Sequence, residues 1–121
     1  MNLRSRTFFI LMFVALVVAS AVAQTNTIVS IRAVAGGVEL ELQSTREFPV
    51  RDEQVILRIG SVEGTSSRPP DDGSLDTLIF FLTSERFSQT ATGDRVTVRY
   101  GRESTDVWDF GELDKSLVGR P

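Results

Sequence analysis

The sequence predicts an all-β domain, built as a small antiparallel β-sandwich of about six or seven short strands. Several short segments alternate apolar and polar residues with the two-residue period of half-buried strands. Turn-rich connections with glycine, proline and small polar residues separate these segments. Only residues 83–89 have the composition of a helical turn, with Thr83 or Ser84 as its cap. A small β-barrel is the alternative arrangement for the same strands.

Residues 1–23 are predicted to be a secretory signal peptide. Arg4 and Arg6 supply a positively charged start, an apolar run follows, and small residues end the segment at Ala23. The apolar run is shorter than the ~20 residues that span a bilayer, which argues against an uncleaved anchor. We therefore expect cleavage near Ala23 and a single secreted or periplasmic domain, 24–121, that is not embedded in a membrane.

The charge and composition of this domain exclude several classes of function. Two of the 13 basic residues and none of the 16 acidic residues lie in 1–23, so residues 24–121 carry a formal net charge of −5. This balance argues against nucleic acid or an anionic membrane as the main partner. The chain has no histidine and no cysteine, which removes the usual residues of serine triads, thiol catalysis, zinc sites and haem ligation. The sequence therefore predicts a protein that is not an enzyme and has no disulfide.

The first strand is expected at residues 28–34, where apolar and polar side chains alternate. In this phase Val29, Ile31 and Ala33 face the core. Ile28 then starts the solvent-facing side of the strand.

A turn at 35–37 follows, because glycine reaches positive φ without steric cost. Residues 38–42 have the most regular alternation in the chain and predict the second strand. Residues 48–50 are expected to form a short edge strand, since a proline cannot donate to a ladder. The next strand is expected at 55–60, with Ile56 on the face opposite the core.

Residues 61–74 are predicted to form a long loop, because serine, proline, aspartate and glycine dominate them. Loops of this length in compact domains are often functional. Asp71, Asp72 and Asp76 carry the hard oxygens that calcium prefers, whereas a Pro-Pro-Asp-Asp-Gly series is also typical of a simple turn. No cofactor is predicted apart from this candidate calcium site, which melting curves with calcium and with chelator would test.

The strand expected at 78–82 is apolar on both faces, so its second face must be covered. One interpretation is that Phe87 and nearby loops cover it. The other is that the apolar side chains dock a partner chain. The predicted partner-binding residues are Ile56, Arg68, Ile79 and Phe81.

Residues 95–100 and 107–111 predict a hairpin whose aromatic face belongs to the core. The single tryptophan lies in its second strand and is expected to be central to that core. A polar tail at 114–121 follows the hairpin, with Leu113 and Leu117 as candidate anchors.

The side chains that remain as candidates for catalysis are carboxylates and the single lysine. Carboxylate-only catalysis, such as glycoside hydrolysis, has four candidate groups near the end of the hairpin. These are Asp106, Asp109, Glu112 and Asp114. Acids this close in sequence are typical of solvated surface, and Lys115 in the polar tail is a poor candidate nucleophile.

The spacing of the predicted strands favours an immunoglobulin-like architecture, although the chain lacks the cysteines of antibody domains. Such sandwiches place recognition on their loops. The predicted function is therefore an exported, non-enzymatic module that binds a protein or a carbohydrate. The alternative is a self-associating structural component of a cell envelope or extracellular assembly, which would form a homo-oligomer.

Overall fold

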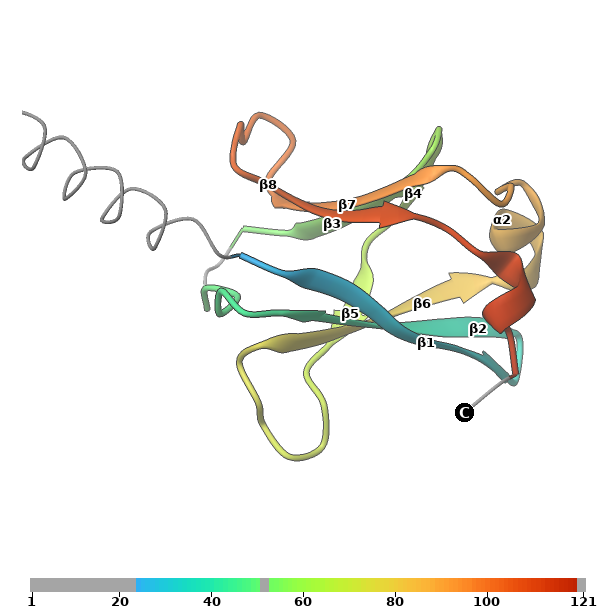
Figure 1. Cartoon of the computed structure of the whole chain (residues 1–121), viewed down its shortest axis with the longest axis horizontal. Helices are drawn as coiled ribbons and strands as arrows, with labels where there is room; N and C mark the ends of the chain where they lie inside the picture. Colours follow the sequence, from blue (N-terminus) through green and yellow to red (C-terminus); the bar gives the residue numbers. More distant parts are fainter. Residues whose placement is uncertain (1–23, 51–52, 120–121) are drawn as a thin grey trace, which may run out of the picture.

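Two stacked antiparallel sheets make up the fold of the computed structural model (Figure 1). The structure describes residues 24–50 and 53–119, so the predicted signal peptide lies outside the described residues. The strands are β1 (Asn26–Val34), β2 (Gly37–Ser44), β3 (Val55–Ile59), β4 (Val62–Gly64), β5 (Ser66–Arg68), β6 (Thr77–Thr83), β7 (Arg95–Tyr100) and β8 (Val107–Glu112). The helices are α2 (Ser84–Ser88) and the 3-10 helix η1 (Lys115–Leu117).

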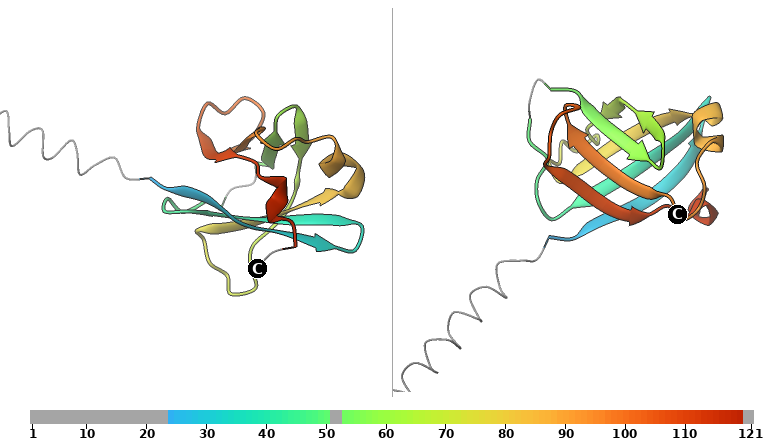
Figure 2. Two further views of the ribbon diagram at one scale, coloured as in Figure 1. Left: turned by 45° about the vertical axis from the view of Figure 1, so that its right-hand side comes forward. Right: turned by 90° about the horizontal axis from the view of Figure 1, so that it is seen from above.

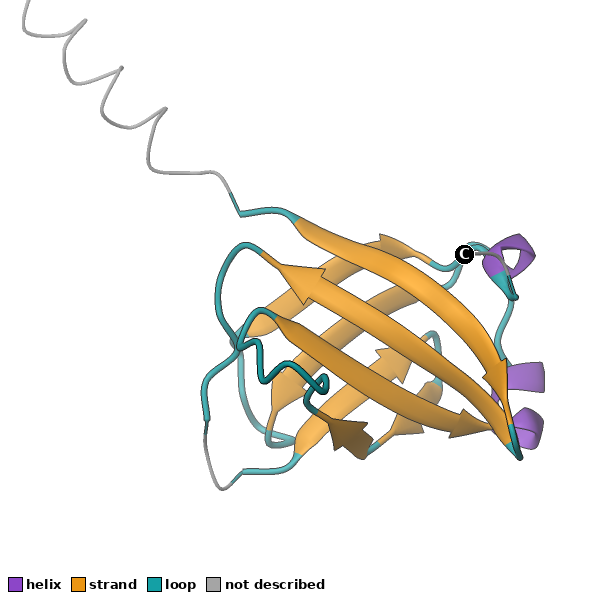
Figure 3. Cartoon of the chain, turned by 90° about the horizontal axis from the view of Figure 1, so that it is seen from below, coloured by secondary structure: helices purple, strands orange, loops and turns teal. Residues whose placement is uncertain are grey.

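The order of the strands is that of an immunoglobulin-like sandwich. Sheet A has the order β1-β2-β6-β5 and sheet B the order β4-β3-β7-β8. Immunoglobulin strands are lettered A to G in chain order, and here β4 is an extra edge strand outside that series. The remaining strands of the first sheet, β1-β2-β6-β5, then correspond to A-B-E-D, and those of the second sheet, β3-β7-β8, correspond to C-F-G. Figure 2 shows the two sheets from the side and from above, and Figure 3 shows sheet A from below. The predicted β-sandwich is confirmed, and the closed-barrel alternative is wrong, since the strands form two separate sheets.

The hydrophobic core lies between the two sheets, and several of its aromatic rings pack against one another. As predicted, alternate residues of β2, β3, β7 and β8 enter it. Trp108 is 1% exposed, and its ring centroid lies 5.5 Å from that of Phe48 and 5.6 Å from that of Tyr100. The predicted hairpin is confirmed, with Val98 opposite Trp108.

Strand β1 has a different phase from the predicted one. Its register against β2 shifts between Ile28 and Ser30, so that Val29 is the extra residue of a β-bulge. Ile28 consequently packs against the core together with the fully buried Ile31. Val29 is 45% exposed and Ala33 is also exposed, so the predicted inward orientation is right for Ile31 alone.

The predicted loop at 61–74 is wrong for its first half. Here β4 pairs with β3 and β5 pairs with β6, so the chain crosses from sheet B to sheet A at Thr65. The Leu82 side chain packs closely against the crossing, since a Cβ at Gly64 would lie 2.7 Å from Leu82 Cδ2. Both strands have only three residues, too few for an alternating pattern, although β4 pairs with the strand directly before it and β5 with the next strand along the chain. The remaining loop, 69–76, extends below sheet A (Figure 1).

Residues 48–50 form no strand, contrary to the prediction. The main-chain N–H of Phe48 donates to the Leu75 oxygen at 2.8 Å, which ties this segment to the 69–76 loop and not to a sheet. The Phe48 side chain is 4% exposed and belongs to the core. An apolar residue here indicated burial correctly, but burial does not require a strand.

Helix α2 has the predicted position and cap. The Thr83 hydroxyl oxygen accepts from the main-chain N–H of Arg86 at 3.2 Å. Phe87 packs against the core cluster, so its predicted role as a cover for the second face of β6 is wrong. Lys115 Nζ donates to the main-chain oxygens of Phe87 (2.9 Å) and Thr90 (2.5 Å). The lysine thus stabilises the end of the helix, where carbonyl oxygens lack partners within the helix.

The C-terminal segment covers part of the free edge of β1. Leu113 is 1% exposed and anchors the segment, as predicted, whereas Leu117 is 36% exposed. Val118 forms a parallel bridge with Ile31, and the N–H of Gly119 donates to the Ile31 oxygen at 3.0 Å. Since exposed strand edges pair readily with other chains, this cover protects the longest edge strand of the sandwich.

Candidate functional site

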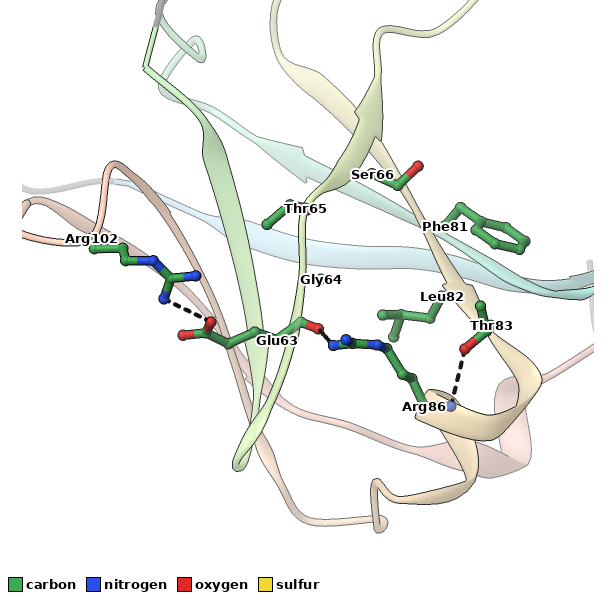
Figure 4. A pocket seen from close by; sticks show the side chains of 9 residues that line it. All are labelled: Glu63, Gly64, Thr65, Ser66, Phe81, Leu82, Thr83, Arg86 and Arg102. Atoms are coloured by element: carbon green, nitrogen blue, oxygen red, sulfur yellow. Dashed lines mark hydrogen bonds and ion pairs between the residues drawn. The ribbon is translucent and has the colours of Figure 1, made fainter.

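A cleft of ≈ 470 Å³ opens where the crossing chain separates from β6 (Figure 4). One wall comes from Gly64 of β4, Ser66 of β5 and Thr65, which links the two strands. The opposite wall comes from the end of β6 and from Arg86 of α2. The ladder between β5 and β6 stops at the Ser66–Phe81 pair, and beyond it the two walls diverge.

This cleft brings together the two stretches in which the sequence predicts a binding site, 61–74 and 78–82. The 61–74 stretch supplies one wall through residues 63–66, and the 78–82 stretch supplies the other through Phe81 and Leu82. Phe81 is half-buried and lies beside Ser66 in Figure 4. A partly exposed aromatic ring, hydroxyl groups and charged groups therefore line the same cleft.

The charged groups of the cleft are centred on Glu63. Its carboxylate accepts a hydrogen bond from Arg102 Nη1 at 2.9 Å, while its main-chain oxygen accepts from Arg86 Nη1 at 2.6 Å (Figure 4). The hydrogen bond from Arg102 holds the pKa of the Glu63 carboxyl below its usual range, and the nearby guanidinium groups of Arg58 and Arg99 lower it further. Glu63 is thus ionised in a positively charged surrounding.

A second hollow of ≈ 660 Å³ adjoins the cleft. The two hollows share Glu63, Thr83 and Arg86. The second one extends along the turn after β3 and along α2, and Arg58 and Glu85 line it. Arg86 therefore lies between two hollows that follow the same border between the sheets.

Three of the four predicted partner-binding residues lie together, on the outer face of sheet A. Arg68 is opposite Ile79, and the guanidinium group of Arg68 reaches across β6 to Glu39 with N–O distances near 3.3 Å. Ile79 is 8% exposed beneath this contact, and Phe81 lies next to it. Ile56 is in sheet B and is 1% exposed, so it shares no surface with the other three.

Each of the candidate calcium ligands forms hydrogen bonds or an ion pair with a different residue. Asp72 Oδ1 accepts from the main-chain N–H (3.0 Å) and hydroxyl (2.6 Å) of Ser74, and this hydroxyl lowers the pKa of Asp72. Asp71 lies 3.7 Å from Arg68, and Asp76 accepts from the hydroxyl of the next residue. In residues 24–50 and 53–119, no three acidic, histidine or cysteine side chains form a group suited to a metal ion. The turn interpretation accounts for this segment, and calcium binding stays a prediction.

Three of the four carboxylates near the end of the hairpin, Asp106, Asp109 and Asp114, contact different parts of the fold, and Glu112 lies opposite Arg95 in the ladder between β7 and β8. Asp106 forms an ion pair with Arg46, which precedes the core residue Phe48. Asp109 forms one with Arg95 at 3.2 Å. Asp114 caps η1 through its side chain. These contacts are of the structural kind expected for surface acids.

Sequence reasoning missed Arg86 and Arg102 as members of the site. Arg86 lies within the capped helical turn, where a basic residue usually indicates only a solvated surface. Arg102 lies in the turn between β7 and β8 and meets Glu63 only because β4 runs along the edge of sheet B. A prediction of β4 would have been needed to bring these residues together.

Comparisons with known proteins give no assignment: no family model, no curated protein and no solved structure matches the chain. Within the described part of the chain, neither helix has the length and apolar character needed to cross a membrane.

Proposed function

We propose that this chain is an exported, non-enzymatic binding module and that the cleft at Glu63 binds its partner, a protein or a carbohydrate outside the cytoplasm. One observation carries the proposal. The sequence predicts the 61–74 and 78–82 stretches as binding regions for separate reasons, and residues of both line the same cleft.

The chemistry of the cleft supports recognition more than catalysis. Thr65 and Ser66 offer hydroxyl groups, Arg86 and Arg102 offer directional N–H donors, and Phe81 offers an apolar surface. Binding sites usually combine apolar surface with a few polar groups that fix orientation. The absence of histidine and cysteine from the sequence supports a non-enzymatic role, and the signal-peptide pattern supports export.

The test is a binding screen of residues 24–121 against immobilised oligosaccharides and peptides. We expect Ser66→Trp to abolish binding, because its indole would fill the cleft. Ser67→Trp is the matched control, since Ser67 is the neighbouring exposed serine and does not line the cleft. Circular dichroism melting curves establish that both variants are folded. Binding that survives Ser66→Trp, or the absence of any binding by the wild type, would contradict the proposal.

Self-association through the outer face of sheet A is the second candidate function. The observation that favours it is the half-buried Phe81 beside β5, an edge strand whose three residues are all exposed. Light scattering coupled to size exclusion distinguishes the two functions. A dimer that Phe81→Asp converts to monomer would support self-association. A monomer at every concentration would rule it out and leave the binding module.

A further inference from the structure

The outer face of sheet B buries an apolar side chain beside an arginine. Ile56 is 1% exposed, yet it lies outside the core cluster, on the side of β3 that faces away from sheet A. Arg99 is directly opposite it in the ladder between β3 and β7, where the Cβ atoms of a pair are about 5 Å apart. An arginine stem covers apolar surface while its charged end stays near solvent. The contact with Ile56 therefore keeps the half-buried Arg99 on this face.

Arg99 also has a donor that no protein group satisfies in the part of the chain that the structure describes. Its Nε atom is buried and has no hydrogen-bond acceptor there. Buried donors in folded proteins nearly always have an acceptor, so an unpaired one is a reason to look for a ligand. Arg95, on the same strand and the same face, differs because its Nη1 donates to the Asp109 carboxylate at 3.2 Å.

Glu63 is the common neighbour of Arg99 and two further guanidinium groups. Arg102 donates to its carboxylate at 2.9 Å (Figure 4), and Arg58 is directly opposite it in the ladder between β3 and β4. Arg99 is close enough to lower the pKa of Glu63. We name these four residues, Arg58, Glu63, Arg99 and Arg102, the guanidinium cluster. Three positive charges against one negative charge leave a net charge of +2, in a domain that is acidic overall.

Most N–H donors of the guanidinium cluster have no protein acceptor among the described residues. Arg58 donates to the main-chain oxygen of Gly60 at 3.2 Å, and Arg102 donates to Glu63. Each guanidinium group has five N–H donors, and its planar fork matches two oxygens of a phosphate group. Because Arg99 breaks no hydrogen bond with a described residue when its side chain rotates, it is free to turn its Nε–H toward an incoming oxyanion.

We propose that the guanidinium cluster binds a dianionic phosphate group, with Arg99 directing its Nε–H to a phosphate oxygen and Arg58 and Arg102 supplying further donors. The net charge of the cluster favours a dianion over a carboxylate, because a dianion neutralises the cluster completely. The site lies on the outer face of sheet B. The inference goes beyond the proposed function, since it does not depend on what the cleft binds.

Equilibrium dialysis of residues 24–121 against radiolabelled inorganic phosphate tests the site. The buffer is held at pH about 8, well above the second phosphate pKa of about 6, and sodium chloride keeps the ionic strength constant. We expect saturable uptake that unlabelled phosphate displaces and that acetate, a monoanion, does not. Glucose 6-phosphate distinguishes the two sources of the group. If it displaces the label at a lower concentration than inorganic phosphate does, the ligand is a phosphate monoester, and otherwise it is the free ion.

Substitutions in the guanidinium cluster test which residues hold the phosphate. Arg99→Gln should weaken binding by about tenfold or more, because it removes a charge and the Nε donor. Arg58→Gln should act similarly, which keeps the test decisive if the loss of the Arg99 stem prevents folding. Arg95→Gln is the matched control and should bind as the wild type does. Glu63→Gln should strengthen binding, since it removes a like charge. Circular dichroism melting curves establish which variants are folded.

Three results would overturn the inference. The first is the absence of saturable phosphate uptake by the wild type. The second is displacement by acetate as effective as displacement by phosphate, which would mean that the positive face attracts anions in general. The third is a folded Arg99→Gln or Arg58→Gln variant that binds phosphate as tightly as Arg95→Gln does. Ser66→Trp separates this inference from the proposed function, because it should abolish partner binding in the cleft and leave phosphate uptake unchanged.

Discussion

Trp108→Ala is expected to lower the free energy of unfolding by about 3–5 kcal/mol, the range for removing a buried tryptophan or phenylalanine. Trp108 is 1% exposed and contacts the rings of Phe48 and Tyr100, with the Arg46 guanidinium 4.0 Å from its ring centroid. No single neighbour can fill the resulting cavity, because these contacts come from separate segments. Domains of this size have about 5–15 kcal/mol of total stability, so much of the domain's stability would be lost.

Urea denaturation followed by circular dichroism measures this loss. Val107→Ala is the matched control: Val107 precedes Trp108 in β8, is 43% exposed, and should change stability by only about 0.5 kcal/mol. If Trp108→Ala produces little change in the midpoint, the tryptophan is not central to the core.

Gly37→Ala is expected to destabilise the domain by about 3 kcal/mol, the upper part of the usual range for overpacking. A Cβ at Gly37 would lie 2.0 Å from the main-chain oxygen of Leu82 and 3.0 Å from Thr83 Cα. These are backbone atoms, which cannot rotate away as the end of a flexible side chain can. The alanine must therefore push β2 away from β6 in the middle of sheet A.

The neighbouring glycine provides a control with a different physical cause. Gly36 has φ +85°, and a Cβ there would meet only Phe81 Cζ at 3.8 Å. Gly36→Ala should thus cost about 1–2 kcal/mol, the penalty for a left-handed conformation. Denaturation of both variants gives the comparison. A smaller loss for Gly37→Ala than for Gly36→Ala would show that the packing of β2 against β6 is less restrictive than the structure indicates.

The candidate site was predictable in part. The sequence indicated the 61–74 and 78–82 stretches because both lacked the regular alternation of a half-buried strand. It did not indicate that they meet, since β4 and β5 are too short to produce a pattern of their own. Ile56 was grouped with Ile79 because both face away from the core, but the two residues lie in different sheets.

Local chemistry by itself determined the alternation of Val38, Leu40 and Leu42, the aromatic hairpin and the capped turn at Thr83, because each depends on residues close in sequence. Tertiary structure alone decided the bulge at Val29, the crossing of the chain at 62–68, and the cleft. The reason is physical: a strand's ladder, its register and the space beside it depend on which strand it pairs with and how, and the alternation within one short segment specifies neither.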